Sequence, residues 1–293
     1  MTDYSSQLFP YAYNILGSAE DARDAVQDVL EKHYAEAREG VENEKAYLIR
    51  SVINRAINLK TRRQHTAPPG VWLPEPIATE SADAAVYLKD ILSYSLLVLL
   101  ERLNAQERAV FILRESFDYA HEEIGAILSI TEAHSRKLLS RAKEKLFKPG
   151  DGAQGPADGN GRGTAVSPRA LALLQDYIGA IRGRDILRLE QMLAADVAFF
   201  ADGGGKRKVV MQQCRGAAEV AGLLSFTYHT YQRKSAIRVI TVNHQPAFLF
   251  YNKMLLVACQ VFDISEADGK IWGISTVVDP EKLRGVDEQS VVG

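Results

Sequence analysis

The chain of 293 residues lacks several features that would assign it to a class directly. It has only two cysteines, Cys214 and Cys259, and they match no metal-ligand spacing, so neither a disulfide framework nor a metal site is expected. No apolar run is long enough to span a membrane, and the N-terminus lacks the basic start and apolar stretch of a signal peptide. We therefore expect a cytoplasmic protein with no cofactor, no metal and no membrane partner.

The chain also lacks an excess of basic residues. Its 35 Lys and Arg residues are slightly outnumbered by 37 Asp and Glu residues, which gives a formal net charge of −2. A protein that binds DNA by itself usually has a basic excess. Any basic surface must therefore be local, and tight binding to DNA is expected to need a larger partner.

One local basic surface is predicted between Asn104 and Leu146. A short helix with an apolar face ends near Ser129, and Thr131 is placed to cap a second helix. Beyond its first turn the second helix carries one acid, Glu144, and six bases: Arg136, Lys137, Arg141, Lys143, Lys145 and Lys148. This pattern predicts a helix-turn-helix whose second helix enters a DNA major groove, the alternative being a solvated basic face.

Charge is segregated near the N-terminus. Residues 18–44 contain nine acids and three bases, whereas residues 45–63 contain six bases and no acid, and both stretches have helical periodicity. Four acids share one face of the first helix: Asp21, Asp24, Asp28 and Glu31. In the second helix Arg50, Asn54, Asn58 and Arg62 recur every four residues, so they share an exposed side. The acidic helix suits a basic protein surface, and the basic helix suits nucleic acid.

Two linkers divide the chain. Residues 67–85 are rich in proline and contain Trp72, which we expect to pack against a neighbouring domain. Residues 149–164 are rich in glycine and are expected to be flexible. The predicted parts are 1–66, the linker 67–85, 86–148, the linker 149–164, and 165–293. The first two domains are all-α, with helix expected at 83–103, and the last is α+β, with helices followed by a curved antiparallel sheet. Its strands are expected at 197–200, 208–211, 237–242, 247–251, 255–262 and 271–278.

Several strings within the first 148 residues carry a family resemblance. They are residues 12–18, 21–28, 46–56, 105–111 and 123–125. In combination they resemble a bacterial sigma factor of the extracytoplasmic-function group. Residues 72–76 (WLPEP), 202–206 (DGGGK) and 278–283 (VDPEKL) are similar to motifs of a subgroup with a fused SnoaL-like domain, which has an NTF2-like cone fold. The chain departs from that pattern at Val278, where asparagine is expected, at Ser129 and at Ser135.

The resemblance implies a sigma factor that directs core RNA polymerase to promoter DNA, with a C-terminal domain that regulates it in cis and no enzymatic step. It implies that the acidic face binds the polymerase. The DNA-binding set would be Arg50, Asn54, Asn58, Arg62 and Arg63 at the promoter element that melts, and His134, Ser135, Arg136, Lys137 and Arg141 at the distal element. The interdomain regulatory set would be Trp72, Pro74, Glu75, Asp202, Gly203, Gly204, Gly205, Lys206, Asp279, Pro280 and Lys282.

Two alternatives stay open from the residues themselves. The chain could be a ligand-binding regulator that acts on DNA without core polymerase, or a SnoaL-like enzyme tethered to a DNA-binding half. For the enzyme, a proton-transferring group could come from Asp202, His229, Asp263 or Asp279. Such residues more often cap helices or satisfy turns. The sequence does not tell whether a small molecule binds the C-terminal domain.

Overall fold

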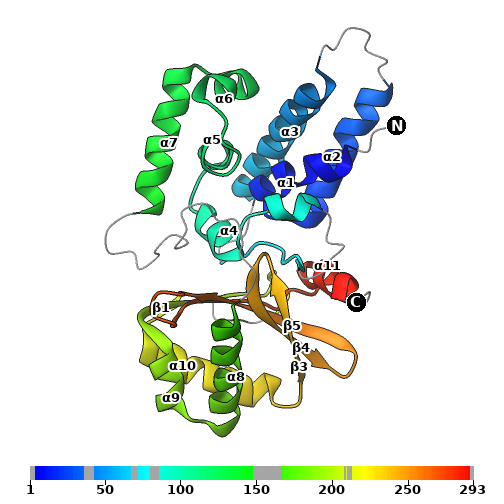
Figure 1. Cartoon of the computed structure of the whole chain (residues 1–293). Helices are drawn as coiled ribbons and strands as arrows, with labels where there is room; N and C mark the ends of the chain where they lie inside the picture. Colours follow the sequence, from blue (N-terminus) through cyan, green and yellow to red (C-terminus); the bar gives the residue numbers. More distant parts are fainter. Residues whose placement is uncertain are drawn as a thin grey trace.

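A computed structural model describes residues 4–35, 43–66, 71–79, 86–147, 167–207, 209 and 213–290. Figure 1 shows two halves, with the helices of the N-terminal half above and a curved sheet with its own helices below. The predicted linker at 149–164 and Lys148 lie outside the described residues. Within the described residues, no helix combines the length and the apolar character needed to cross a membrane.

The first domain is a bundle of α1 (Ser5–Leu16), α2 (Ala19–Ala35) and α3 (Glu44–Thr66). The α1 helix ends at Gly17, whose φ of 70° is readily adopted by glycine. Ser18 accepts a hydrogen bond from the Asp21 N–H at 3.2 Å and so caps the start of α2.

The second helical domain comprises η1 (Val86–Asp90), α4 (Tyr94–Leu100), α5 (Ala105–Glu115), α6 (His121–Leu128) and α7 (Glu132–Leu146). The prediction of one helix over 83–103 is wrong, because the chain leaves helical geometry between η1 and α4. Asn14 stabilises this break, donating to the Asp90 carbonyl at 2.9 Å and accepting from the Leu92 N–H at 3.0 Å.

The predicted helix-turn-helix is confirmed as α6 and α7. Ser129 at the turn has a φ of 56°, a left-handed conformation that favours glycine. Thr131 caps α7 by accepting from the His134 N–H at 3.2 Å. A side chain at Gly125 would come within 2.8 Å of the Ile130 carbonyl oxygen, so the tight turn requires glycine there.

The C-terminal domain has a six-stranded sheet in the order β2-β1-β6-β5-β4-β3. Its strands are β1 (Leu193–Asp202), β2 (Cys214–Arg215), β3 (Ala236–Val242), β4 (Gln245–Asn252), β5 (Leu255–Ile264) and β6 (Ile271–Val277). Its helices are α8 (Pro168–Gly183), α9 (Ile186–Met192), α10 (Ala217–Thr227), the π-helical turn η2 (Tyr228–Gln232) and α11 (Pro280–Ser290).

Two features of this domain differ from the sequence prediction. The sheet is mixed, because β6 returns from the β5–β6 hairpin beside β1 and runs parallel to it. The α10 helix was not predicted, although its Ala and Leu residues favour helix. The strand expected at 208–211 falls almost entirely outside the described residues.

The two faces of the sheet bury different partners, because successive side chains of a strand alternate. Helices α8, α9 and α10 cover one face (Figure 1), where Tyr177, Phe248 and Phe262 are buried. The opposite, outer face buries Leu249 and other apolar side chains against Leu73 of the linker, Tyr94 of α4 and residues of α11. The outer face thus forms its core with the N-terminal half.

Candidate DNA-binding and interdomain sites

The predicted polymerase-binding acids lie together on α2. Asp24 and Glu31 are exposed, whereas Asp28 pairs with Arg55 of α3 at 2.6 Å and Asp21 pairs with Arg63 at 3.3 Å. The two exposed carboxylates leave an acidic ridge accessible on this helix. Binding of the polymerase by this ridge stays a prediction.

The predicted DNA face of α3 contacts the helix-turn-helix. Arg50 donates to the Ser129 hydroxyl at 3.0 Å, and Asn54 donates to the Ile127 carbonyl at 3.0 Å. Asn58 and Arg62 are exposed farther along α3. The structure therefore brings the two predicted DNA-reading elements against each other.

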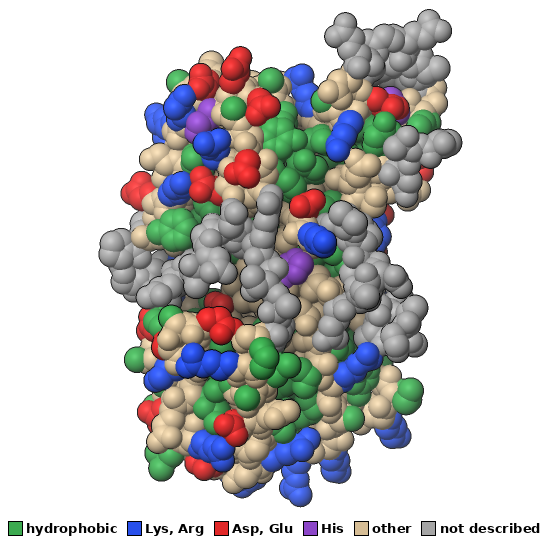
Figure 2. All heavy atoms as spheres, in the orientation of Figure 1, with side chains coloured by type: hydrophobic (Ala, Val, Ile, Leu, Met, Phe, Trp, Pro, Cys, Tyr) green, Lys and Arg blue, Asp and Glu red, His purple; other side chains and the backbone are tan. Residues whose placement is uncertain are grey.

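Most predicted distal-element residues lie on the open side of α7. His134, Arg136, Lys137 and Arg141 are exposed, and Arg136 forms an ion pair with Glu132 one turn earlier. Ser135 is buried, and its hydroxyl is 2.9 Å from His121 Nδ1. A direct contact between Ser135 and DNA would require α6 and α7 to separate. Figure 2 shows charges of both signs interspersed over the described part of one molecular face, in keeping with the near-neutral composition.

A buried ionic cluster joins the two helical domains. Lys60 of α3 is 2.6 Å from the Glu101 carboxylate, which also pairs with Arg108 of α5. Arg108 donates to the Asn14 carbonyl of α1 at 2.8 Å. Burial lowers the pKa of Lys60 well below its usual value, and the nearby Arg108 adds to this effect. Removing one partner of such a buried pair by mutation would leave an uncompensated charge, whereas separating the domains would return both charges to water.

Trp72 packs between the two halves, as predicted. Its ring lies against Gly17, with Arg63 and Lys282 each 3.9 Å from the ring centroid and Lys60 at 4.9 Å. The ring therefore links α3 to α11 through cation–π contacts. Arg63 also donates to the Leu16 carbonyl at the end of α1, so in this arrangement its guanidinium contacts both α1 and Trp72.

The Asp202 and Lys282 side chains clasp the backbone of the linker. Asp202 accepts from the Leu73 N–H at 2.8 Å, and Lys282 donates to the Leu73 carbonyl at 2.6 Å. Lys282 and Asp202 pair with each other at 2.6 Å. Asp202 and Lys282 thus bind the linker through the backbone N–H and carbonyl of Leu73, groups that every residue except proline supplies. The specificity of the contact lies in Asp202 and Lys282.

The remaining residues of the predicted regulatory set support this clasp or the linker. Asp202 accepts from the Gly204 N–H at 2.8 Å, and a side chain at Gly204 would collide with the Asp279 carboxylate. Lys206 pairs with Glu281. Gly203 is buried against the Arg207 carbonyl, Pro74 is buried, and Gly205 and Pro280 are exposed. A regulatory role for the set stays a prediction.

Glu75, in the linker, caps the N-terminus of α2. Its carboxylate accepts from the Ala19 N–H at 2.6 Å and the Glu20 N–H at 3.2 Å. Burial raises the pKa of Glu75, while these N–H groups oppose the rise. An acid at a helix N-terminus is stabilised by the helix dipole, so the linker is anchored to the first domain here.

Asn243 was not predicted, yet it joins three parts of the chain. It lies at the β3–β4 turn with a φ of 46° and is fully buried. Its amide accepts from the Ile77 N–H at 3.0 Å and donates to the Tyr13 hydroxyl at 2.9 Å and the Leu92 carbonyl at 3.2 Å. An Asn-His turn between apolar strands was the local signal. Its partners are distant in sequence, so the sequence alone does not reveal them.

The candidate proton-transferring residues of the C-terminal domain mostly serve structure. Asp202 holds the linker, His229 Nε2 is 2.9 Å from the Ile181 carbonyl, and Asp279 accepts from the Glu281 N–H at 3.1 Å. Asp263 accepts one hydrogen bond from Gln245 at 3.1 Å. Among the described residues there is no group of three metal-ligating side chains.

The fold and the helix-turn-helix define a multidomain transcription factor. Residues 1–66 match the model of sigma-70 region 2, and residues 93–146 match that of sigma-70, region 4. The chain is 24% identical over 294 residues to the ECF RNA polymerase sigma factor SigJ of Mycobacterium tuberculosis (strain ATCC 25618 / H37Rv), covering 95% of this chain and 90% of that protein. It is 27% identical over 288 residues to the probable ECF RNA polymerase sigma factor SigI of the same species (strain CDC 1551 / Oshkosh), covering 96% and 92%.

The crystal structure of Mycobacterium tuberculosis SigJ shares the fold over 96% of each chain, with a TM-score of 0.73 and 21% sequence identity. The chain therefore carries sigma-70 regions 2 and 4, is similar over almost its whole length to extracytoplasmic-function sigma factors, and shares the overall fold of SigJ. It directs core RNA polymerase to promoter DNA to initiate transcription. The two matched sigma regions are named region 2 and region 4 below.

Proposed function

We propose that the C-terminal domain regulates this sigma factor in cis by holding regions 2 and 4 in an arrangement that cannot engage a promoter. One observation carries the proposal: the predicted DNA face of α3 contacts the helix-turn-helix, with Arg50 3.0 Å from the Ser129 hydroxyl in the turn and Asn54 3.0 Å from the Ile127 carbonyl at the end of α6. Hydrogen bonds at this distance leave no room for a DNA strand at Arg50 and Asn54. Promoter binding requires the two regions to separate.

The linker, which Asp202 and Lys282 hold, allows the C-terminal domain to stabilise this arrangement of regions 2 and 4. Residues 71–79 connect the regions along the outer face of the sheet, and Ala78 forms an antiparallel bridge with Val242. Tyr94 at the start of α4 is buried in the same apolar cluster and donates to the Pro74 carbonyl at 2.7 Å. Undocking would expose Tyr94, Leu73 and the apolar outer face to water, which disfavours opening.

The partners follow from this mechanism. Core polymerase binds the accessible acids of α2 and supplies the DNA affinity that a chain of net charge −2 lacks. The site of action is then the cytoplasm, where polymerase and promoters are. A non-enzymatic C-terminal domain is favoured because the helix-covered side of its sheet is filled by packed rings, with Phe248 and Phe262 centroids 4.8 Å apart.

A run-off transcription assay with core polymerase tests the proposal. Lys282→Met removes the charge that holds the Leu73 carbonyl and the Trp72 ring, and Lys253→Met is the matched control in an exposed turn of the same domain. We expect Lys282→Met to raise promoter-specific output several-fold with unchanged binding to core polymerase. Unchanged output from Lys282→Met would refute regulation through the clasp. Tight, sequence-specific DNA binding by the free protein would favour the direct regulator instead.

A further inference from the structure

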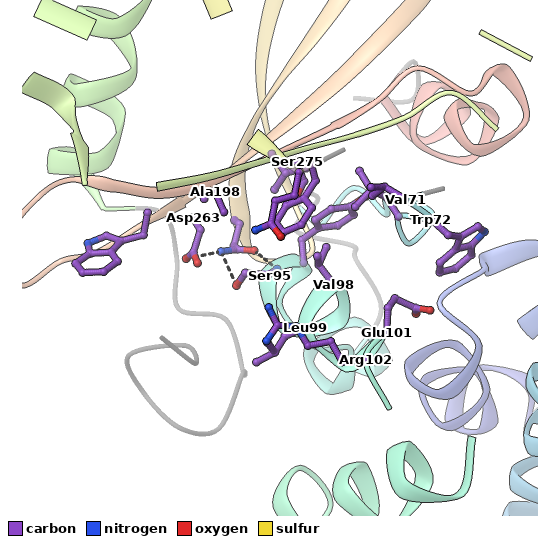
Figure 3. A pocket seen from close by; sticks show the side chains of 18 of the residues that line it. Val71, Trp72, Ser95, Val98, Leu99, Glu101, Arg102, Ala198, Asp263 and Ser275 are labelled. Carbon is purple, nitrogen blue, oxygen red and sulfur yellow. Dashed lines mark hydrogen bonds between the residues drawn. The ribbon is translucent and has the colours of Figure 1, made fainter. Parts of the chain in front are cut away.

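A cavity of about 330 Å³ lies between the C-terminal domain and region 4. Figure 3 shows Ala198, Asp263 and Ser275 on the sheet side and Ser95, Val98 and Leu99 on the α4 side, with Val71 of the linker closing one end. The cavity is on the outer face of the sheet, away from the side that helices α8–α10 cover. Its size is at the lower end of the range for small-molecule sites.

Most of the cavity wall is apolar. The linker, α4 and the sheet each contribute apolar side chains to it: Val71, Val98, Leu99, Phe200 and Val261. Such a wall suits a hydrocarbon or aromatic body. Charged groups at the lining are Glu101, Arg102, Arg215 and Asp263.

Asp263 gives the cavity a polar end with unused hydrogen-bonding capacity. Gln245 donates to Asp263 Oδ1 and to the Ser95 hydroxyl, both at 3.1 Å, and accepts from the Ser95 N–H at 2.7 Å. Both ends of the Gln245 amide are therefore engaged. Within the described residues, no hydrogen bond reaches Asp263 Oδ2, which lies on the side of Gly273. A partly buried carboxylate oxygen gains from a donor that replaces lost water.

We propose that this cavity binds a small molecule with an apolar body and a terminal hydrogen-bond donor, an amine or hydroxyl, that Asp263 accepts. The linker, α4 and the sheet each form part of the wall, so the complete cavity exists only when the domains are docked. A ligand that binds only the docked state stabilises it, by about 100-fold in the docking equilibrium at 100 times its dissociation constant. This consequence rests on the proposed function, in which docking is the inactive state.

Three probes with one body and different ends test the binding site: 4-phenylbutylamine, 4-phenylbutan-1-ol and 4-phenylbutyrate. With the full-length protein at pH 7.5, calorimetric titration should show binding of the amine and the alcohol, and at least tenfold weaker binding of the acid. Asp263→Asn should weaken amine binding at least tenfold and reduce the discrimination against the acid. Asp176→Asn, at an exposed position on α8, is the matched control and should leave all three affinities unchanged. Val98→Phe should reduce binding of all three by filling the cavity.

Absence of binding by both the amine and the alcohol would overturn the proposal, as would affinities unaffected by Asp263→Asn. Hydrogen exchange of residues 71–79 should slow on adding the amine, and unchanged exchange at saturation would overturn the coupling to docking. Failure of the proposed function has a different signature, because Lys282→Met would then leave transcription unchanged while the probes still bound in an Asp263-dependent manner.

Discussion

Asn243→Ala should undock the C-terminal domain more effectively than any other single truncation in the β3–β4 hairpin. The change removes three side-chain hydrogen bonds, to Ile77, Tyr13 and Leu92, at 2.9–3.2 Å. At about 1 kcal/mol for each bond, their loss weakens docking by about 3 kcal/mol. Alanine in the left-handed conformation of residue 243 costs about 1 kcal/mol more. The expected loss of docking free energy is therefore about 4 kcal/mol.

Hydrogen exchange of the linker amides measures this loss. Leu73, Glu75 and Thr79 donate to Asp202, Gly17 and Thr241, partners that the substitution leaves in place. A loss of about 3 kcal/mol or more should accelerate their exchange at least about 100-fold. Asn243→Gly, which keeps the left-handed backbone, should give the smaller loss of about 3 kcal/mol. Asn252→Ala, at the exposed end of β4, should change little. If Asn243→Ala left the exchange of these three amides within threefold of the wild type, the role of Asn243 in keeping the C-terminal domain docked would be refuted.

Three further predictions concern pH, DNA and the helix-turn-helix. Burial raises the pKa of Asp263 to about 6, so between pH 4 and 6 the folded state keeps a proton that the unfolded state loses. The free energy of unfolding should therefore fall by about 2 kcal/mol as pH rises from 4 to 6.5. Denaturant melts of Asp263→Asn should lack this fall. Arg136→Ala and Lys137→Ala should weaken transcription from promoters that depend on the distal element about tenfold, and equal losses at promoters lacking that element would contradict the assignment. Ser129→Gly should stabilise the helix-turn-helix by up to about 1 kcal/mol, because glycine adopts the left-handed turn without strain. A lower thermal midpoint would contradict this, because the lost hydrogen bond from Arg50 would then cost more than the relieved backbone strain.

Local sequence signals predicted the parts of the fold that local interactions determine. The Thr131 cap and the apolar spacing of α6 lie within a few residues of one another, so the helix-turn-helix was predictable. The parallel pairing of β1 and β6 was not, because alternation of apolar residues identifies a strand but not its direction.

Some of the interdomain contacts could likewise be predicted from the sequence, and others could not. Trp72 was predicted to pack because an apolar ring in a proline-rich linker needs a partner, and Lys282 was in the same predicted interdomain set. The sequence did not identify Gly17 and Arg63 as further neighbours of the ring. Arg108 and Asn243 are buried polar residues with partners as far away in the chain as Asn14 for Arg108, 94 positions, and Tyr13 for Asn243, 230 positions. Nothing in their local sequence identifies these distant partners, so only the folded structure reveals them.

The distance between regions 2 and 4 tests the central claim most directly. Gln27→Cys on α2 and Glu144→Cys on α7 place fluorophores at exposed positions, and both native cysteines are buried. Single-molecule energy transfer should show one compact population in the otherwise unaltered protein. Adding Asn243→Ala should produce a second population with a longer distance and should raise transcription with core polymerase. One compact population in both proteins would contradict the claim that the C-terminal domain holds the two regions together.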